Sequence, residues 1–158
     1  MENLSKRFAG AVADGPPRFV PQLPDVNVES PLAQAAYVDL KLMGMPRVNL
    51  LLAGPDNAVH AVLDLLSKDL REPVTRWRTG EPLVLPRVER GGTMVLEDIG
   101  SLPRADQLNL LDWIEAASGR TQIVSTTRGS LMSRVRSGQF LDMLYYRLNT
   151  LYVDLANP

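Results

Sequence analysis

The chain is 158 residues long, 45% of them hydrophobic and 22% charged, and it carries a net charge of −1. These values are typical of a single globular domain, and the low net charge argues against bulk nucleic acid or an anionic membrane as a partner. The chain has no cysteine, which excludes disulfides and thiolate metal sites. No apolar run reaches the roughly 20 residues of a membrane-spanning helix, so we expect a cytoplasmic protein without a membrane partner.

Residues 1–27 are predicted to form an arm outside the domain. Four of the twelve prolines lie between Pro16 and Pro24. Proline fixes φ and removes a backbone donor, which favours an extended chain over a helix. Such an arm can lie across the domain, pair with a neighbour or trail from the terminus, and trailing is the most common outcome. We place the domain itself at residues 28–158.

Strands and helices are predicted to alternate within the domain. Short apolar runs between turn residues indicate strands, and apolar residues spaced three and four apart indicate helices. The predicted strands cover residues 48–53, 73–77, 93–96, 121–126 and 151–155. This alternation is typical of a parallel sheet covered by helices.

The predicted helices begin at Ser30-Pro31, after Pro55, after Pro103, at Leu131 and near Leu141. Each has an apolar side that we expect to be buried. Those sides consist of Leu32, Ala35, Ala36, Leu40 and Met43 in the first helix, Val59, Val62, Leu63, Leu66 and Leu70 in the second, Leu110, Leu111, Ile114 and Ala117 in the third, and Leu141, Leu144, Tyr145 and Leu148 in the last.

The stretch GGTMVLEDIG, from Gly91 to Gly100, places two acids directly after an apolar strand. Glu97 and Asp98 follow the run that ends at Leu96. Ligands of open α/β sheets bind beyond the carboxyl ends of the strands. The acid pair therefore fits a magnesium–nucleotide site, and it also fits a solvated strand end, because many strands stop in charge.

Four ordered segments resemble the central domain of the sigma-54-dependent transcriptional activators, which are AAA+ ATPases. These segments are GGTMVLEDIGSLP, QLNLLDWIE, TQIVSTTRGSL and GQFLDMLYYRLN; the family has GGTLFLDEIGELP, a leucine-rich helix, RIIAATNRDL and GRFREDLYYRLN. The resemblance covers about residues 30–155. It implies a three-layer α/β sandwich of the P-loop NTPase type, with a five-stranded parallel sheet in the order 5-1-4-3-2. We expect no helical lid after the last strand.

The resemblance also implies that the phosphate-binding loop is degenerate. Where the family has GESGTGKE, Gly54 keeps the first glycine, Asn57 and Val59 replace the next two, and His60 stands at the lysine. A β-branched valine resists the φ > 0 geometry of such a loop, and histidine is mostly neutral at pH 7. We give little weight to His60 as a ligand-binding residue and expect Asp56 or Asn57 to cap the helix.

Further departures fall on other positions that the family uses for catalysis. The acid order is reversed, with Glu97 before Asp98, and Arg128 replaces the asparagine that senses the γ-phosphate. We expect Arg128 to form an ion pair with an acid, because four arginines and no acid lie between Arg120 and Arg136. Leu141 replaces the first arginine of the FRED segment, and Arg147 keeps the second arginine of the motif.

Residues 71–90 contain neither the further helix nor the GAFTGA loop with which the family engages sigma-54. Five arginines stand against three glutamates in this interval. We interpret it as a solvated, faintly basic face rather than a nucleic-acid site.

These observations favour a non-hydrolysing AAA+-like module that acts in transcriptional regulation or signalling by binding protein, either a second copy or an AAA+ activator, near Arg147. That function requires no cofactor and no metal. The alternative is a weak ATP-binding or ATP-hydrolysing domain that uses ATP and magnesium with Glu97, Asp98 and Arg147. Direct DNA binding ranks last, since no recognition element is apparent.

Overall fold

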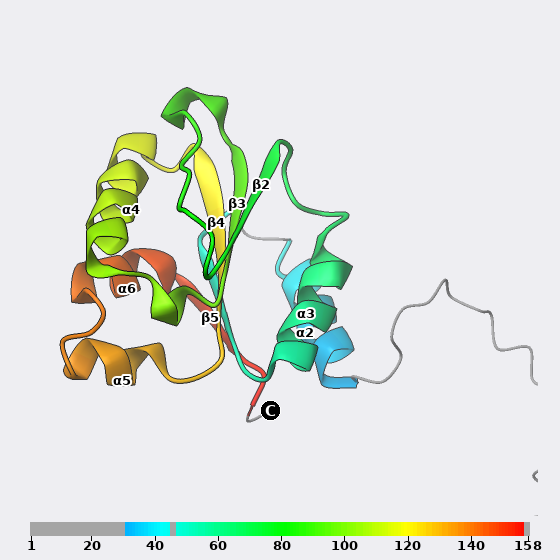
Figure 1. Ribbon diagram of the computed structural model, residues 1–158. Coiled ribbons are helices and arrows are strands. Elements are labelled where there is room, and N and C mark those ends of the chain that lie inside the picture. The colour runs from blue at the N-terminus through cyan, green and yellow to red at the C-terminus, as the bar shows by residue number, and fades with distance from the viewer. Residues whose placement is uncertain (1–30, 45–46, 157–158) are drawn as a thin grey trace, which may run out of the picture.

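The computed structural model describes residues 31–44 and 47–156, so the predicted arm at residues 1–27 lies outside the described part of the chain. Five strands form one sheet in the order β2-β3-β4-β1-β5, with helices on both faces (Figure 1). In chain order the elements are α2 (Pro31–Leu42), β1 (Leu50–Ala53), α3 (Asp56–Leu66), β2 (Val74–Arg78), η1 (Val88–Arg90), β3 (Gly92–Glu97), η2 (Ile99–Ser101), α4 (Arg104–Ala117), β4 (Thr121–Thr127), α5 (Leu131–Arg136), α6 (Asp142–Leu148) and β5 (Leu151–Asp154).

The strand order confirms the predicted fold. The expected order 5-1-4-3-2 is the observed order read from the opposite edge of the sheet, and all four neighbouring pairs are parallel. β1 lies inside the sheet between β4 and β5. Its sequence, LLLA, is buried along its whole length, as a strand covered on both faces requires.

Two hydrophobic cores lie on opposite faces of the sheet. Figure 1 shows α2 and α3 on one face and α4, α5 and α6 on the other. Because successive side chains of a strand point to opposite faces, Leu51 packs in the core beneath α4 and α6, whereas Leu50 and Leu52 pack beneath α2 and α3. In β3, Met94 and Val95 divide between the two cores in the same way.

The predicted buried side of the second helix is confirmed, and that of the first needs a correction. All five residues predicted for α3 and the turn after it are buried, namely Val59, Val62, Leu63, Leu66 and Leu70. In α2 the buried residues are Ala33, Ala36 and Leu40, while Ala35 and Met43 are exposed. The buried stripe is rotated because positions 33, 36 and 40 share a side at helical spacing. Ala35 lies outside the stripe but has the same side chain as Ala33 and Ala36 within it, so the sequence pattern does not separate them.

Asp69, in the segment that follows α3, binds two side chains of α2. The Lys41 ammonium lies 2.7 Å from Asp69 Oδ1, and the Tyr37 hydroxyl donates to Asp69 Oδ2 at 2.8 Å. The hydrogen bond from Lys41, and then that from Tyr37, lowers the pKa of Asp69 below its ordinary value of 3.8. This contact therefore contributes to stability above pH 3.8 and is lost as the pH falls through the lowered pKa.

The interval between β2 and β3 is an irregular segment that closes the core on the α4 side. The Trp77 indole donates to the Glu81 carbonyl at 2.9 Å, and the Trp113 indole donates to the Pro86 carbonyl at 2.7 Å. Leu83 and Leu85 pack against the same core. Apart from the short η1, this interval holds no helix, in agreement with its predicted lack of the family's extra helix.

None of the helices in residues 31–44 and 47–156 is long and apolar enough to cross a membrane.

Replacement of Gly92 by alanine tests the fit between β3 and the segment before β2. Gly92 has φ of +85°, and a Cβ there would overlap the Pro73 backbone. Gly119 has a similar φ of +77° with open space around it. We expect Gly92→Ala to lower the free energy of unfolding by about 3 kcal/mol or more, from backbone strain plus steric overlap. Gly119→Ala should cost about 1 kcal/mol from strain alone. Urea unfolding compares the two, and equal losses would contradict the proposed overlap.

Candidate functional site

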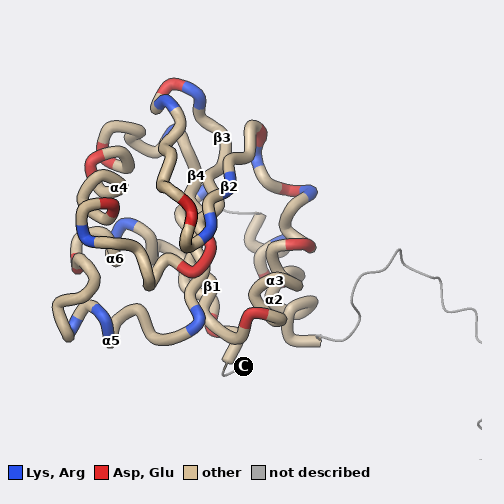
Figure 2. The backbone as a smooth tube through the Cα atoms, viewed as in Figure 1, with Lys and Arg blue, Asp and Glu red and all other residues tan. Residues whose placement is uncertain are grey.

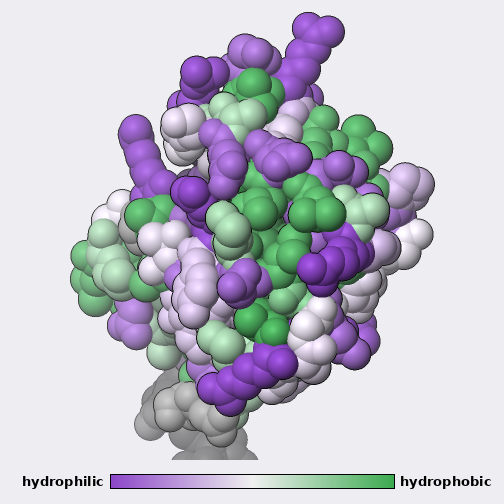
Figure 3. Space-filling view, turned by 90° about the vertical axis from the view of Figure 1, so that its left-hand side faces the viewer, coloured by the Kyte–Doolittle hydropathy of each residue, from purple (hydrophilic) through white to green (hydrophobic). Residues whose placement is uncertain are grey.

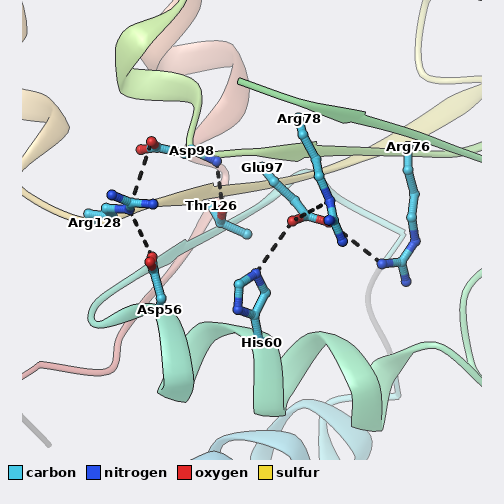
Figure 4. Close-up of polar contacts among 8 residues, drawn as sticks. All are labelled: Asp56, His60, Arg76, Arg78, Glu97, Asp98, Thr126 and Arg128. Carbon is cyan, nitrogen blue, oxygen red and sulfur yellow. Dashed lines mark hydrogen bonds and ion pairs between the residues drawn. The ribbon is translucent and has the colours of Figure 1, made fainter. Parts of the chain in front are cut away.

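The carboxyl edge of the sheet gathers most of the residues singled out in the sequence. Glu97 ends β3 and Asp98 follows it, while Arg128 and Gly54 come directly after β4 and β1. His60 reaches this edge from α3, and Figure 4 shows its ring directed toward Glu97. Acidic and basic residues are intermingled over the sheet and its helices rather than segregated (Figure 2), so each acid has to be followed to its own partner.

Glu97 is a buried carboxylate among cationic groups. Its side chain is 8% exposed, and its Oε2 lies 3.2 Å from Arg78 Nε and 3.4 Å from His60 Nε2. Its Oε1 lies 3.6 Å from Arg76 Nη1 and has no hydrogen-bond partner among the described residues. The carboxylate is thus already paired with guanidinium groups of its own chain, and a metal ion would have to compete with them.

Arg76 and Arg78 are functional-site residues that the sequence interpretation missed. β2 pairs with β3 in a register that sets Arg78 opposite Glu97, and strand alternation puts Arg76 on the same face as Arg78. Residues 71–90 were predicted to be a solvated face, and both arginines are in fact exposed in part. The available signal was the spacing of two arginines, two positions apart, at the end of a predicted strand.

Asp98 and Asp56 share the guanidinium of Arg128. Arg128 Nε donates to Asp56 Oδ1 at 2.9 Å and lies 3.8 Å from Asp98 Oδ2. The predicted ion pair of Arg128 with an acid is therefore confirmed, with Asp56 as the nearer partner. Asp98 has left-handed backbone angles, φ 55° and ψ 56°, and its N–H donates to the Thr126 hydroxyl at 2.9 Å. Both its backbone and its side chain are held to β4 and the residue after it.

The connection from β1 to α3 has only two residues, Gly54 and Pro55. At Gly54 a Cβ would come within 2.9 Å of the Leu155 Cβ, so glycine is needed here for packing. Asn57 and Val59, the positions of the family's later glycines, lie inside α3. The Val59 N–H donates to the Pro55 carbonyl at 3.0 Å. The backbone that would wrap a phosphate is therefore helical in this chain.

The predicted side-chain cap of α3 is wrong. Pro55 occupies the position before the helix, and no side chain caps it. Asp56 is the first helical residue, and its carboxylate accepts from Arg128 instead of from the helix backbone. The competing ion pair accounts for the difference.

Arg147 lies at the opposite, amino-terminal edge of the sheet, so the structure does not bring it to Glu97 and Asp98 within one chain. It is 53% exposed and lies 3.5 Å from Glu115. Together they line a hollow with a volume of about 640 Å³, which Asn49 and Tyr146 also border. Arg120, one of the four arginines counted around Arg128 in the sequence, also lies at this end because it precedes β4.

Across residues 31–44 and 47–156, no group of three or more His, Cys, Asp and Glu side chains is arranged to hold a metal ion. Glu97 and Asp98 adjoin in sequence, but their carboxylates serve different arginines. The ion pairs of Glu97 and Asp98 link the carboxyl ends of β2, β3 and β4. A metal site here would need these ion pairs to open.

The relatives in sequence are regulatory proteins. The chain is 28% identical to the Nif-specific regulatory protein of Enterobacter agglomerans over 141 residues, which is 82% of this chain and 25% of the relative. It is 31% identical over 77 residues to the sigma-54-dependent transcriptional regulator SfnR of Pseudomonas fluorescens (strain Pf0-1), covering 42% of this chain and 21% of that protein. The chain thus spans a quarter or less of the length of these relatives.

Solved structures share the fold. NtrX from Brucella abortus in complex with ATP superposes with a TM-score of 0.61 at 14% identity, covering 97% of this chain and 42% of NtrX. A further NtrX structure from the same organism gives a TM-score of 0.59 at 13% identity, over 96% of this chain and 40% of NtrX. Similarity at this identity establishes the fold alone.

The model of the Sigma-54 interaction domain matches residues 51–157. This match covers more than half of the chain and runs from within β1 through β5. The chain therefore belongs to the Sigma-54 interaction domain family, the AAA+ domain of sigma-54-dependent activators.

Proposed function

We propose that this domain does not hydrolyse ATP and acts in transcriptional regulation by binding another protein. The observation that carries the proposal is that Glu97 is buried and paired with Arg78 and Arg76. Glu97 stands at a position where the family has an acid that holds the metal. The helical backbone at Asn57 and Val59, where the family has its phosphate-binding loop, supports the same conclusion.

The β1–α3 connection gives a triphosphate few groups to bind. A phosphate loop offers several convergent backbone N–H groups and a lysine. Here the Val59 N–H is used within the helix, and Pro55 has no N–H to offer. His60 replaces the lysine, and its Nε2 is 3.4 Å from Glu97, so the side chain faces the acid in place of a phosphate.

Magnesium binding at this edge meets a comparable obstacle. Magnesium requires octahedral oxygen ligands and gives up its waters reluctantly. To reach Glu97 it has to displace Arg78 at 3.2 Å, and to use Asp98 it has to break the Arg128 contact. Separating a buried carboxylate from its counter-charge is unfavourable unless the metal replaces it in full.

A weak ATP-binding or ATP-hydrolysing domain is the second candidate function. It is favoured by the position of Glu97 and Asp98, two acids at the carboxyl end of β3, and by the half-exposed Arg147. In that case ATP and magnesium are the cofactors, and Arg147 acts on the nucleotide of a neighbouring subunit because it lies far from Glu97 in its own chain.

The protein partner that we propose is the AAA+ domain of a sigma-54 activator, contacted near Arg147. The Arg147–Glu115 pair is half exposed and open to exchange with an acid of the partner. Tyr146 is 67% exposed beside it, and tyrosine and arginine are enriched at protein interfaces. We expect no direct binding to DNA, given the net charge of −1.

Calorimetric titration with ATP and magnesium tests the loss of nucleotide binding. We expect no heat of binding at about 1 mM ATP, because the chain lacks a phosphate-binding loop and an acid free to hold magnesium. A dissociation constant well above about 1 mM would have little functional consequence. NtrX from Brucella abortus, which was solved with ATP, serves as the positive control. Heat that disappears in Glu97→Gln would establish the second candidate function instead.

A double-mutant cycle measures how firmly Glu97 is held. Arg78→Ala should lower the free energy of unfolding by about 1–2 kcal/mol, because a buried carboxylate loses its nearest counter-charge at a site open to water. Arg76→Ala is the matched control, and its longer contact predicts a loss below about 0.5 kcal/mol. In the Glu97→Gln background the cost of Arg78→Ala should fall by at least about half. An unchanged cost in that background, measured in urea, would show that the arginine does not act on Glu97.

Capture of a purified activator AAA+ domain by the immobilised chain tests the protein partner. We expect retention of that domain and a loss of roughly tenfold in affinity with Arg147→Glu, because a central charge is reversed. Arg136→Glu, an equal charge change on exposed α5, should leave the affinity unchanged. If the wild-type chain retains no activator domain, or if both variants behave alike, the assigned surface is wrong.

A further inference from the structure

The outer side of α4 carries an ordered stripe of exposed residues. Arg104, Leu108 and Asp112 follow one another at intervals of four, which places them on one side of the helix. All three are exposed, Leu108 at 49% despite its apolar side chain. Figure 3, which views the molecule from the side that carries α4 in Figure 1, shows apolar atoms gathered at the centre of this face with hydrophilic groups around them.

This stripe is complementary to itself. If a second α4 runs antiparallel across the first, with a two-fold axis at Leu108, position 104 of each helix faces position 112 of the other. The two Leu108 side chains then meet at the axis, and Arg104 of each copy faces Asp112 of the other. Closed dimers have this isologous form, in which one surface serves as both halves of the interface.

The charged residues of the stripe are available for such a contact. The Asp112 side chain has no hydrogen bond or ion pair in the described part of the chain. Arg104 Nη1 donates to the Gly138 carbonyl at 3.2 Å at an exposed site, and the guanidinium has further donors for a carboxylate. The centre of this interface is a single leucine from each copy, which does not fix the orientation of the two helices. The exposed carboxylate and guanidinium groups at matched positions favour the antiparallel orientation.

We propose that a second copy of this chain docks on α4, antiparallel and two-fold about Leu108, with reciprocal Arg104–Asp112 ion pairs. The inference concerns a different surface from Arg147 and does not depend on the loss of ATP hydrolysis. Variants that break the dimer should therefore leave capture of an activator domain unchanged, so the two proposals fail separately.

Sedimentation equilibrium of charge-reversed variants tests the pairing. Arg104→Asp and Asp112→Arg should each weaken dimerisation by roughly tenfold or more, because two attractive pairs become two repulsive ones. The double variant R104D/D112R restores both pairs with their signs exchanged and should recover the wild-type dimer. Failure of the double variant to recover, or a wild-type chain that stays monomeric at about 1 mM, where even a millimolar dimer is half formed, overturns the proposal.

A cysteine placed on the axis tests the geometry independently. The chain contains no cysteine, so Leu108→Cys introduces a single thiol, and two thiols on a two-fold axis approach disulfide distance. Under mild oxidation this variant should form a linked dimer, whereas Leu42→Cys, at an 81% exposed site on α2, should not. Equal cross-linking of both variants would mean random collision and would contradict the assigned axis.

Discussion

A carboxylate buried at the end of a central strand requires a counter-charge, and in this domain the neighbouring strand supplies it. Glu97 is 8% exposed and Arg78 lies 3.2 Å away, set opposite it by the parallel register of β2 and β3. The usual cost of burying an ion is thereby reduced within the chain itself. An acid that is paired in this way stabilises the ends of two strands, and it is correspondingly less available to a metal ion.

The second constraint at the same edge is the shortness of the β1–α3 connection. With only Gly54 and Pro55 between the elements, α3 begins where other P-loop NTPases have a loop. Its first residue, Asp56, binds Arg128, and His60, one turn later, faces Glu97. These two contacts fix the start of α3 against the ends of β3 and β4. The charges at this edge therefore hold the sheet and the helix together.

The fold could be predicted almost completely, because alternating apolar runs and helical spacing report burial directly. A short apolar run such as Leu50 to Leu52, bounded by turn residues, is typical of a strand covered on both faces. The stripe of α2 was predicted wrongly at Ala35 and Met43, since alanines bury little area and mark neither side of a helix clearly. At the site, the ion pair of Arg128 with an acid was predicted from local charge balance. Arg76 and Arg78 were missed because their effect depends on register across two strands, which no single stretch of sequence contains.

The position of Arg76 and Arg78 has one more consequence. Among the strands of the described residues, β2 lies at the edge of the sheet and pairs with β3 alone, and an unpaired edge invites strands of other molecules to add to it. Two long cationic side chains, both exposed in part, belong to this edge strand, and charged residues on an edge strand make pairing with another strand unfavourable. The two arginines that pair with Glu97 therefore also protect the domain from aggregation. A change that removes both would reduce its solubility as well as its stability.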